Sequence, residues 1–297
     1  MMSKFLLGTI VATLIIGCAS TASAQLPPAS PASPLPTTTE PQPAPSISPQ
    51  SPATTKPDLT LLGKVLSLFL QTNKAKTDSQ LVMTVQDRGV DVKVYAQTTT
   101  IAKSSGEFRS SLVFVQPGQP PTAKYTIVSD GRKVWIYRPD RRQYSQTTIA
   151  KFQLQPYSYL IGLSSIFFLT VTEPTRRDLK AALAVSPTVL TSLPENQIKD
   201  LQGSRQQVDG RELYAYSYTN QLENWIFNGL VDPQTGILKQ IEFTGKLDPK
   251  DSSNNFTLTE KIIDRNPQPV INNASFKFSP PKGTTKVPSL DIDLTGL

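Results

Sequence analysis

The chain has 297 residues, with 30 Lys and Arg against 23 Asp and Glu and a formal net charge of +7 at pH 7. It contains no histidine, which removes the commonest general base, the usual metal ligand and every catalytic triad built on imidazole. Its single cysteine excludes an intrachain disulfide, so an ordinary hydrophobic core has to stabilise the fold.

The amino terminus has the pattern of an export signal, because Lys4 is followed by an uncharged, mostly apolar run over 5–17. This run is too short to be read as a membrane span. Two processing sites remain open. A small-x-small motif predicts a signal peptide over 1–24, whereas a lipobox-like motif predicts cleavage after 1–17 and a lipid anchor on Cys18. Both alternatives predict a periplasmic protein, and the second attaches it to the outer membrane.

Residues 25–57 form a Pro-rich segment with eleven prolines among Ser, Thr, Ala and Gln. Such a segment has too little apolar surface to offset the entropy of ordering, so we expect a disordered linker. It acts either as a tether, if Cys18 is the true amino terminus, or as a plain spacer. The folded domain is expected over 58–297.

The domain is predicted to open with a helix. Asp58 is a suitable N-cap, and Leu62, Leu66 and Phe69 recur at helical spacing after it. This helix should end near 72–77.

The sequence period then changes from helical to two, which indicates strands joined by short turns. A first antiparallel meander is predicted over 80–88, 91–102, 107–115, 122–129, 132–138 and 141–147. A second group is predicted over 198–208, 212–219, 224–231, 237–245, 255–263 and 275–279. The last of these contains Phe276 and Phe278 at spacing two, expected on one face of a strand.

Residues 149–195 interrupt the strands. The largely apolar stretch 157–171 is interpreted as a buried or lid helix, ended by Glu173-Pro174, with a further short helix over 176–185. Because many strands carry apolar residues on both faces, the pattern predicts a mainly β (α+β) fold with a curved antiparallel sheet and helices against it.

Several segments together resemble the LolA-like superfamily of periplasmic outer-membrane lipoprotein carriers and related periplasmic proteins. The similar segments are 101–103, 106–109, 129–139, 263–267 and 276–283. The resemblance implies an unclosed β-barrel of about 11 to 12 strands, with a helical lid over an apolar concavity that holds acyl chains.

The resemblance also implies a set of apolar residues around the ligand, although core packing is the alternative for each single aromatic residue. The candidate ligand-binding residues are Leu62, Leu66, Phe69, Phe108, Leu112, Phe114, Trp135, Tyr137, Ile166 and Phe167. One departure is clear: Ser104-Ser105 stands where the carriers have the Arg-Pro pair that latches the lid.

The hairpin 131–142 carries five basic side chains, which fit either anionic headgroups and acidic partners or a solvated sheet edge. We predict an exported, non-enzymatic, monomeric carrier or acceptor of acyl chains of lipoproteins or lipids. The alternative is an envelope structural or sensory protein that uses the same fold to bind a protein partner. No metal, cofactor or nucleic acid is expected, since no motif for one is present.

Overall fold

The computed structural model describes residues 56–87, 90–116, 118–153, 155–186, 188–220, 225–246, 255–290 and 292. The predicted signal peptide, Cys18 and nearly all of the Pro-rich linker lie outside the described residues. In the described part of the chain, no helix is both long and apolar enough to cross a membrane.

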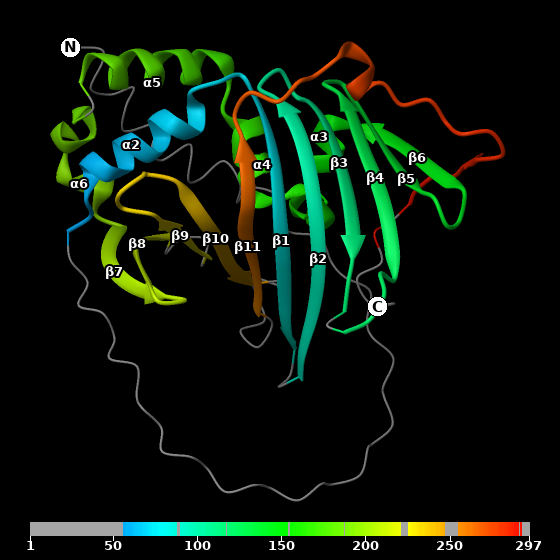
Figure 1. Cartoon of the computed structure of the whole chain (residues 1–297), viewed down its shortest axis with the longest axis horizontal. Coiled ribbons are helices and arrows are strands. Elements are labelled where there is room, and N and C mark those ends of the chain that lie inside the picture. Colours follow the sequence, from blue (N-terminus) through cyan, green and yellow to red (C-terminus); the bar gives the residue numbers. More distant parts are fainter. Residues whose placement is uncertain are drawn as a thin grey trace, which may run out of the picture.

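One mixed sheet of twelve strands dominates the described residues (Figure 1). Its strand order is β12-β6-β5-β4-β3-β2-β1-β11-β10-β9-β8-β7, and all neighbours are antiparallel except β12 and β6. The first half contains β1 (Lys74–Asp87), β2 (Val90–Lys103), β3 (Glu107–Phe114), β4 (Ala123–Asp130), β5 (Lys133–Arg138) and β6 (Gln143–Thr148). The second half contains β7 (Leu201–Val208), β8 (Arg211–Asn220), β9 (Trp225–Val231), β10 (Leu238–Lys246), β11 (Asn255–Asn266) and β12 (Thr285–Lys286).

The sheet is a pair of meanders joined at its centre. Strand β1 pairs with β11 in a long antiparallel ladder in which Leu81 lies opposite Glu260. The outermost strands β12 and β7 do not pair with each other, so the sheet is unclosed. The predicted fold class is therefore confirmed.

Helix α2 (Leu59–Leu70) begins at Asp58, whose side chain accepts a hydrogen bond from the Leu61 backbone N–H at 2.9 Å. Its buried side chains Leu61 and Val65 pack with Leu201, Tyr214, Tyr216 and Val231, so α2 covers the β7–β9 part of the sheet.

The insert between β6 and β7 contains α3 (Ile149–Gln153), η1 (Pro156–Ile161), α4 (Leu163–Thr170), α5 (Glu173–Val185), η2 (Val189–Ser192) and α6 (Glu195–Ile198). It has two parts: α3, η1 and α4 cover the first half of the same face, whereas α5 and η2 pack against α2 (Figure 1). The 3₁₀ segment η1 contacts β2 and β3, and α4 contacts β2. The main core forms between the sheet and the α3, η1 and α4 segments of the insert.

The insert corrects two predictions. The helix expected over 157–171 is divided at Gly162, whose φ of +96° is incompatible with a continuous helix. Glu173-Pro174 begins α5 instead of merely ending the previous helix, because Thr172 is the N-cap and proline suits the first helical turn.

Two strand predictions also need correction. Strand β1 begins at Lys74, six residues before the expected 80, and α2 ends at Leu70. Residues 275–279 form no strand. η3 (Asn273–Phe276) is followed by extended chain that packs on the face of the sheet. Strands pair only along the edge of a sheet, so this chain makes no β-ladder there.

Candidate functional site

An apolar groove lies between α2 and the second half of the sheet. It has a volume of about 120 Å³, and apolar or aromatic side chains and one glycine line it. Helix α2 contributes Leu62, Val65, Leu66 and Phe69, and α4 contributes Phe167. The sheet contributes Leu201, Tyr216, Tyr218, Phe227, Gly229, Val231, Leu238 and Ile241.

Two tyrosines of β8 hold the amino-terminal end of α2. The Tyr216 hydroxyl donates to the Asp58 carbonyl oxygen at 2.6 Å, and the Asp58 backbone N–H donates to the Tyr214 hydroxyl at 2.9 Å. Further along α2, Lys64 Nζ donates to the Gln234 carbonyl oxygen at 2.6 Å. Between these contacts and Phe69, the described side chains of α2 pack mainly on apolar residues of the sheet, α5 and η2.

A cationic and aromatic cluster closes the carboxyl-terminal end of α2. Phe69 meets Phe168 edge to face at 6.2 Å, and the Arg265 guanidinium lies 4.1 Å from the centre of the Phe69 ring. Burial lowers the pKa of Arg265 to about 10, an effect that Glu260 opposes and Arg176 reinforces. This end of the groove therefore carries concentrated positive charge.

A buried carboxylate attaches the insert to the centre of the sheet. Glu260 of β11 is 0% exposed and accepts hydrogen bonds from the Ser79 hydroxyl at 2.6 Å and the Ser164 backbone N–H at 2.6 Å. The Ser164 hydroxyl adds a third bond at 2.8 Å. Burial raises the pKa of Glu260, while these hydrogen bonds and Arg265 act in the opposite direction.

The structure brings together four of the ten predicted ligand-binding residues at the groove, namely Leu62, Leu66, Phe69 and Phe167. The next four are packed in the core between the sheet and the insert, three on β3 and one, Ile166, on α4. They are Phe108, Leu112, Phe114 and Ile166, none more than 6% exposed. Ring contacts fill their surroundings, since Phe108 lies 5.7 Å from Phe152 and Phe114 lies 5.9 Å from Tyr125.

Trp135 and Tyr137 lie on the opposite face of the sheet and do not join this set. Successive residues of a strand alternate between faces, and Val134 and Ile136 take the insert side of β5. Phe278 stacks on Trp135 at 6.1 Å and lies 6.0 Å from Tyr137. The two aromatic side chains therefore form a packing surface for the carboxyl-terminal segment.

The sequence contained a signal for some of the residues that the candidate set omitted. Tyr216 and Tyr218 share one side of β8 by their spacing of two, and both line the groove. Glu260 interrupts an alternating stripe in which Leu258 and Ile262 are buried, which marks it as a carboxylate on the inner face.

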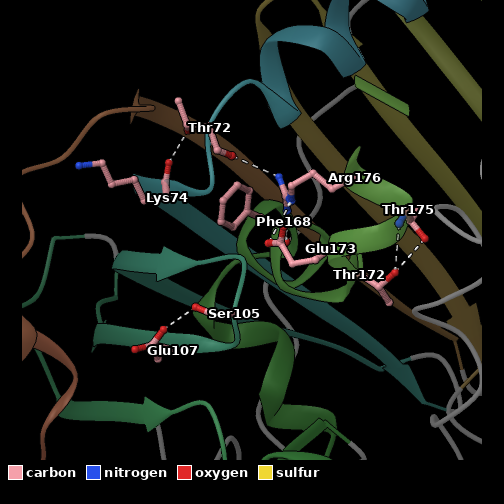
Figure 2. A network of polar contacts seen from close by, with 9 residues as sticks. All are labelled: Thr72, Lys74, Ser105, Glu107, Phe168, Thr172, Glu173, Thr175 and Arg176. Carbon is pink, nitrogen blue, oxygen red and sulfur yellow. Dashed lines mark hydrogen bonds and ion pairs between the residues drawn. The ribbon is translucent and has the colours of Figure 1, made fainter. Parts of the chain in front are cut away.

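The serines at the position of the carriers' Arg-Pro pair take part in a local contact. Ser105 donates its hydroxyl hydrogen bond to Glu107 within the β2–β3 connection, as Figure 2 shows. Among the described residues, no group of three Cys, Asp or Glu side chains is arranged to hold a metal ion.

No family model matches the sequence, and no curated protein matches it. Solved structures similar to this chain include LprF from Mycobacterium bovis, at 14% identity and TM-score 0.32 over 71% of this chain and 94% of that one. A LolA superfamily protein from Nitrosomonas europaea matches at 11% identity and TM-score 0.29, over 73% and 96% of the two chains. A DUF1329 family protein from Desulfovibrio piger matches at 13% identity and TM-score 0.29, over 74% and 98%.

Proposed function

We propose that this protein is an exported carrier or acceptor that binds acyl chains of a lipoprotein or lipid in the groove beneath α2. The observation that carries the proposal is the lining of the groove, which offers apolar and aromatic surface from two helices and four strands of the second half of the sheet. Flexible apolar walls suit a hydrocarbon chain, whereas a catalytic site needs positioned polar groups.

The groove of about 120 Å³ corresponds to a closed state. Ligand pockets usually have volumes of about 300 to 1,000 Å³, so α2 has to move outward before a whole chain enters. Burial of hydrocarbon contributes about 0.8 kcal/mol per methylene, and a sixteen-carbon chain on the order of 10 kcal/mol before the cost of opening is subtracted. Transfer would follow from a change in the opening of α2, since a tightly closed protein neither takes up nor releases cargo.

The proposal includes export of the protein, with cleavage either before Gln25 or before a lipid-modified Cys18. Mass analysis of the mature amino terminus separates the two processing alternatives, because an unmodified Gln25 terminus contradicts lipidation of Cys18. The purified protein should contain acyl lipid that solvent extraction and mass spectrometry detect. Purified protein without lipid, and without affinity for a fluorescent fatty acid, would instead support the alternative of an envelope protein that binds a protein partner.

A variant that fills the groove gives the sharper test. A Cβ atom at Gly229 would have only Leu238 Cδ1 nearby, at an ordinary 3.7 Å, so Gly229→Val should fit and place its methyl groups in the groove. We expect its affinity for a fluorescent fatty acid to fall at least about tenfold while stability is retained. Ser217→Val adds similar bulk to the opposite face of β8 and should bind as the wild type does. Equal binding by all three proteins would contradict the proposal.

A further inference from the structure

A second, polar pocket of about 530 Å³ lies at the carboxyl-terminal end of α2. Its walls are the connection from α2 to β1, one face of α5, and Gln268 after β11. The lining side chains include four cations and one carboxylate: Lys74, Arg176, Arg177, Lys180 and Glu173. This excess of positive charge is suited to an anion.

The α5 residues share one helical face, because positions 173, 176, 177 and 180 follow the spacing of neighbouring turns. Arg176 is the buried member of this face, with a side chain only 2% exposed. Its guanidinium donates to the Phe168 carbonyl oxygen at 2.8 Å and to the Thr72 carbonyl oxygen at 3.3 Å, as Figure 2 shows. These contacts fix the guanidinium between α4, α5 and the α2–β1 connection.

The positive charge of the pocket is only partly neutralised. Arg176 Nε has no hydrogen-bond partner among the described residues, and Glu173 Oε1 lies 4.0 Å from it. Arg177 pairs with Asp178 on its own helix and is 77% exposed. In the same described part of the chain, Lys74 and Lys180 form no salt bridge. Burial also lowers the pKa of Arg176, an effect that a bound anion would oppose.

The polar pocket adjoins the apolar groove through two aromatic rings. The Arg176 guanidinium lies 4.5 Å from the centre of the Phe168 ring, and Phe168 packs against Phe69, which lines the groove. Arg265 lies over both rings, at 4.1 Å and 5.4 Å from their centres. An amphiphile with its hydrocarbon in the groove could thus place a polar head among cations.

We propose that the pocket between α5 and the α2–β1 connection binds the phosphate headgroup of an anionic lipid whose acyl chains occupy the apolar groove. This rests on the proposed function and adds the class of ligand. A phosphate offers several acceptor oxygens, which suit the planar fork of an arginine and the point charges of two lysines. A zwitterionic headgroup would bring its own cation into a pocket that already holds four.

The test uses the whole mature protein, after removal of the signal. It compares two fluorescent lipids with identical acyl chains, phosphatidic acid and phosphatidylcholine. The variant Lys74→Ala/Arg177→Ala/Lys180→Ala removes three cations of the pocket and leaves the buried Arg176 in place. The matched control Lys124→Ala/Lys133→Ala/Lys277→Ala removes the same charge from exposed positions that line neither pocket.

We expect the wild type to bind phosphatidic acid at least about tenfold more tightly than phosphatidylcholine, and the pocket variant to lose most of that preference. The affinity for phosphatidylcholine should be the same in all three proteins, and the control should retain the preference. Inorganic phosphate alone should neither bind tightly nor displace the lipid.

Each other outcome overturns a different statement. Equal affinity of the wild type for both lipids refutes the headgroup site and leaves the acyl-chain proposal intact. Absence of binding to either lipid refutes the acyl-chain proposal and the headgroup site together. Tight binding of inorganic phosphate that the pocket variant loses, with no preference between the lipids, assigns the pocket to a free anion and refutes the lipid headgroup.

Discussion

Glu260 in the middle of β11 caps the amino-terminal end of α4 through Ser164. The backbone N–H and the hydroxyl of Ser164 donate to the two carboxylate oxygens at 2.6 Å and 2.8 Å, and both residues are 0% exposed. A carboxyl oxygen that accepts from the first turn of a helix satisfies backbone donors there, and these hydrogen bonds also link the insert to the sheet. Glu260 therefore adds a buried polar link between the sheet and the insert to the apolar packing between them.

The first prediction concerns pH. Burial raises the pKa of Glu260 above its ordinary value of 4.5, so the native state binds this proton more tightly than the unfolded state does. Its contribution to stability is then greatest at low pH and declines as pH rises from 4.5 through the native pKa. Glu260→Gln should remove this decline. The measurement is urea unfolding of both proteins from about pH 4 to about pH 8.

Two further variants serve as controls for that comparison. Glu260→Ala leaves three buried donors without an acceptor, so its free energy of unfolding should fall by about 2 to 4 kcal/mol at low pH, and by less as pH rises and the wild type loses the contribution of Glu260. Glu242→Gln makes the same substitution at a half-buried carboxyl of the neighbouring strand β10, and shows what the exchange of Glu for Gln does outside the Glu260 site. If Glu260→Gln follows the wild-type curve in parallel, burial does not raise the pKa of this carboxyl.

The second prediction concerns the break between η1 and α4. Gly162 has a φ of +96°, and a Cβ atom there would lie 2.7 Å from Glu260 Oε1. Gly162→Ala should therefore lower the free energy of unfolding by about 3 kcal/mol, through backbone strain and displacement of the carboxylate together. Gly210 also has a positive φ, +73°, but an added Cβ there would meet open space. Gly210→Ala therefore measures the backbone strain alone, expected to lower the free energy of unfolding by about 1 kcal/mol. Equal losses in the two variants would show that the contact with Glu260 costs nothing.

The third prediction concerns the hydrogen bond that attaches the amino-terminal end of α2 to β8. Tyr216→Phe removes the hydroxyl that donates to the Asp58 carbonyl oxygen at 2.6 Å and should cost about 1 kcal/mol of stability. Because this bond fixes one end of α2, hydrogen exchange should accelerate in α2 and remain unchanged in β2–β4. Tyr125→Phe, whose hydroxyl accepts from Arg138 in the other half of the sheet, is the control. Equal acceleration across the whole domain would indicate global destabilisation instead of local opening.

The fourth prediction concerns the packing of Phe278 on the aromatic side chains of β5 and β6, on the outer face of the sheet. Phe278 is half-buried and lies 5.5 Å from Tyr144 and 6.1 Å from Trp135, so Phe278→Ala should loosen the carboxyl-terminal segment and lower the free energy of unfolding by about 1 to 2 kcal/mol. Protease sensitivity after residue 270 should increase. Trp135→Phe should leave binding of a fluorescent fatty acid unchanged, because Trp135 faces away from the groove. Loss of that binding would assign Trp135 to the ligand site after all.

Much of the fold follows from local chemistry in the sequence. The Asp209-Gly210 and Asp232–Gly236 turns do join the antiparallel neighbours that their composition predicts, with left-handed backbone at Asp209, Gly210 and Gly236. The first residues of β1 were missed because their inner positions hold Ala75, Thr77 and Ser79, all buried. Small side chains there give no alternating apolar pattern, although they face the insert.

The site was harder to place for a tertiary reason. The family resemblance implied that Phe108, Leu112 and Phe114 contact a ligand, but a strand pattern does not say which half of the inner face the insert will fill. Trp135 and Tyr137 are also large, mainly apolar residues at spacing two, so the sequence did not separate them from the inner face. Only the position of Phe278 shows that they pack against the carboxyl-terminal segment. The polar pocket at Arg176 combines segments about a hundred residues apart, so no local pattern predicts it.

The pairing of β1 with β11 has a consequence for how the molecule folds. Lys76 lies opposite Asn266 in this ladder, so the middle of the sheet joins parts of the chain made at very different times. Each meander can form from nearby residues as it emerges from the ribosome, but the seam between them must wait for nearly the whole domain to be synthesised. We therefore expect the central seam to be the slow step, and fragments that lack β11 to remain two separate, incompletely covered half-sheets.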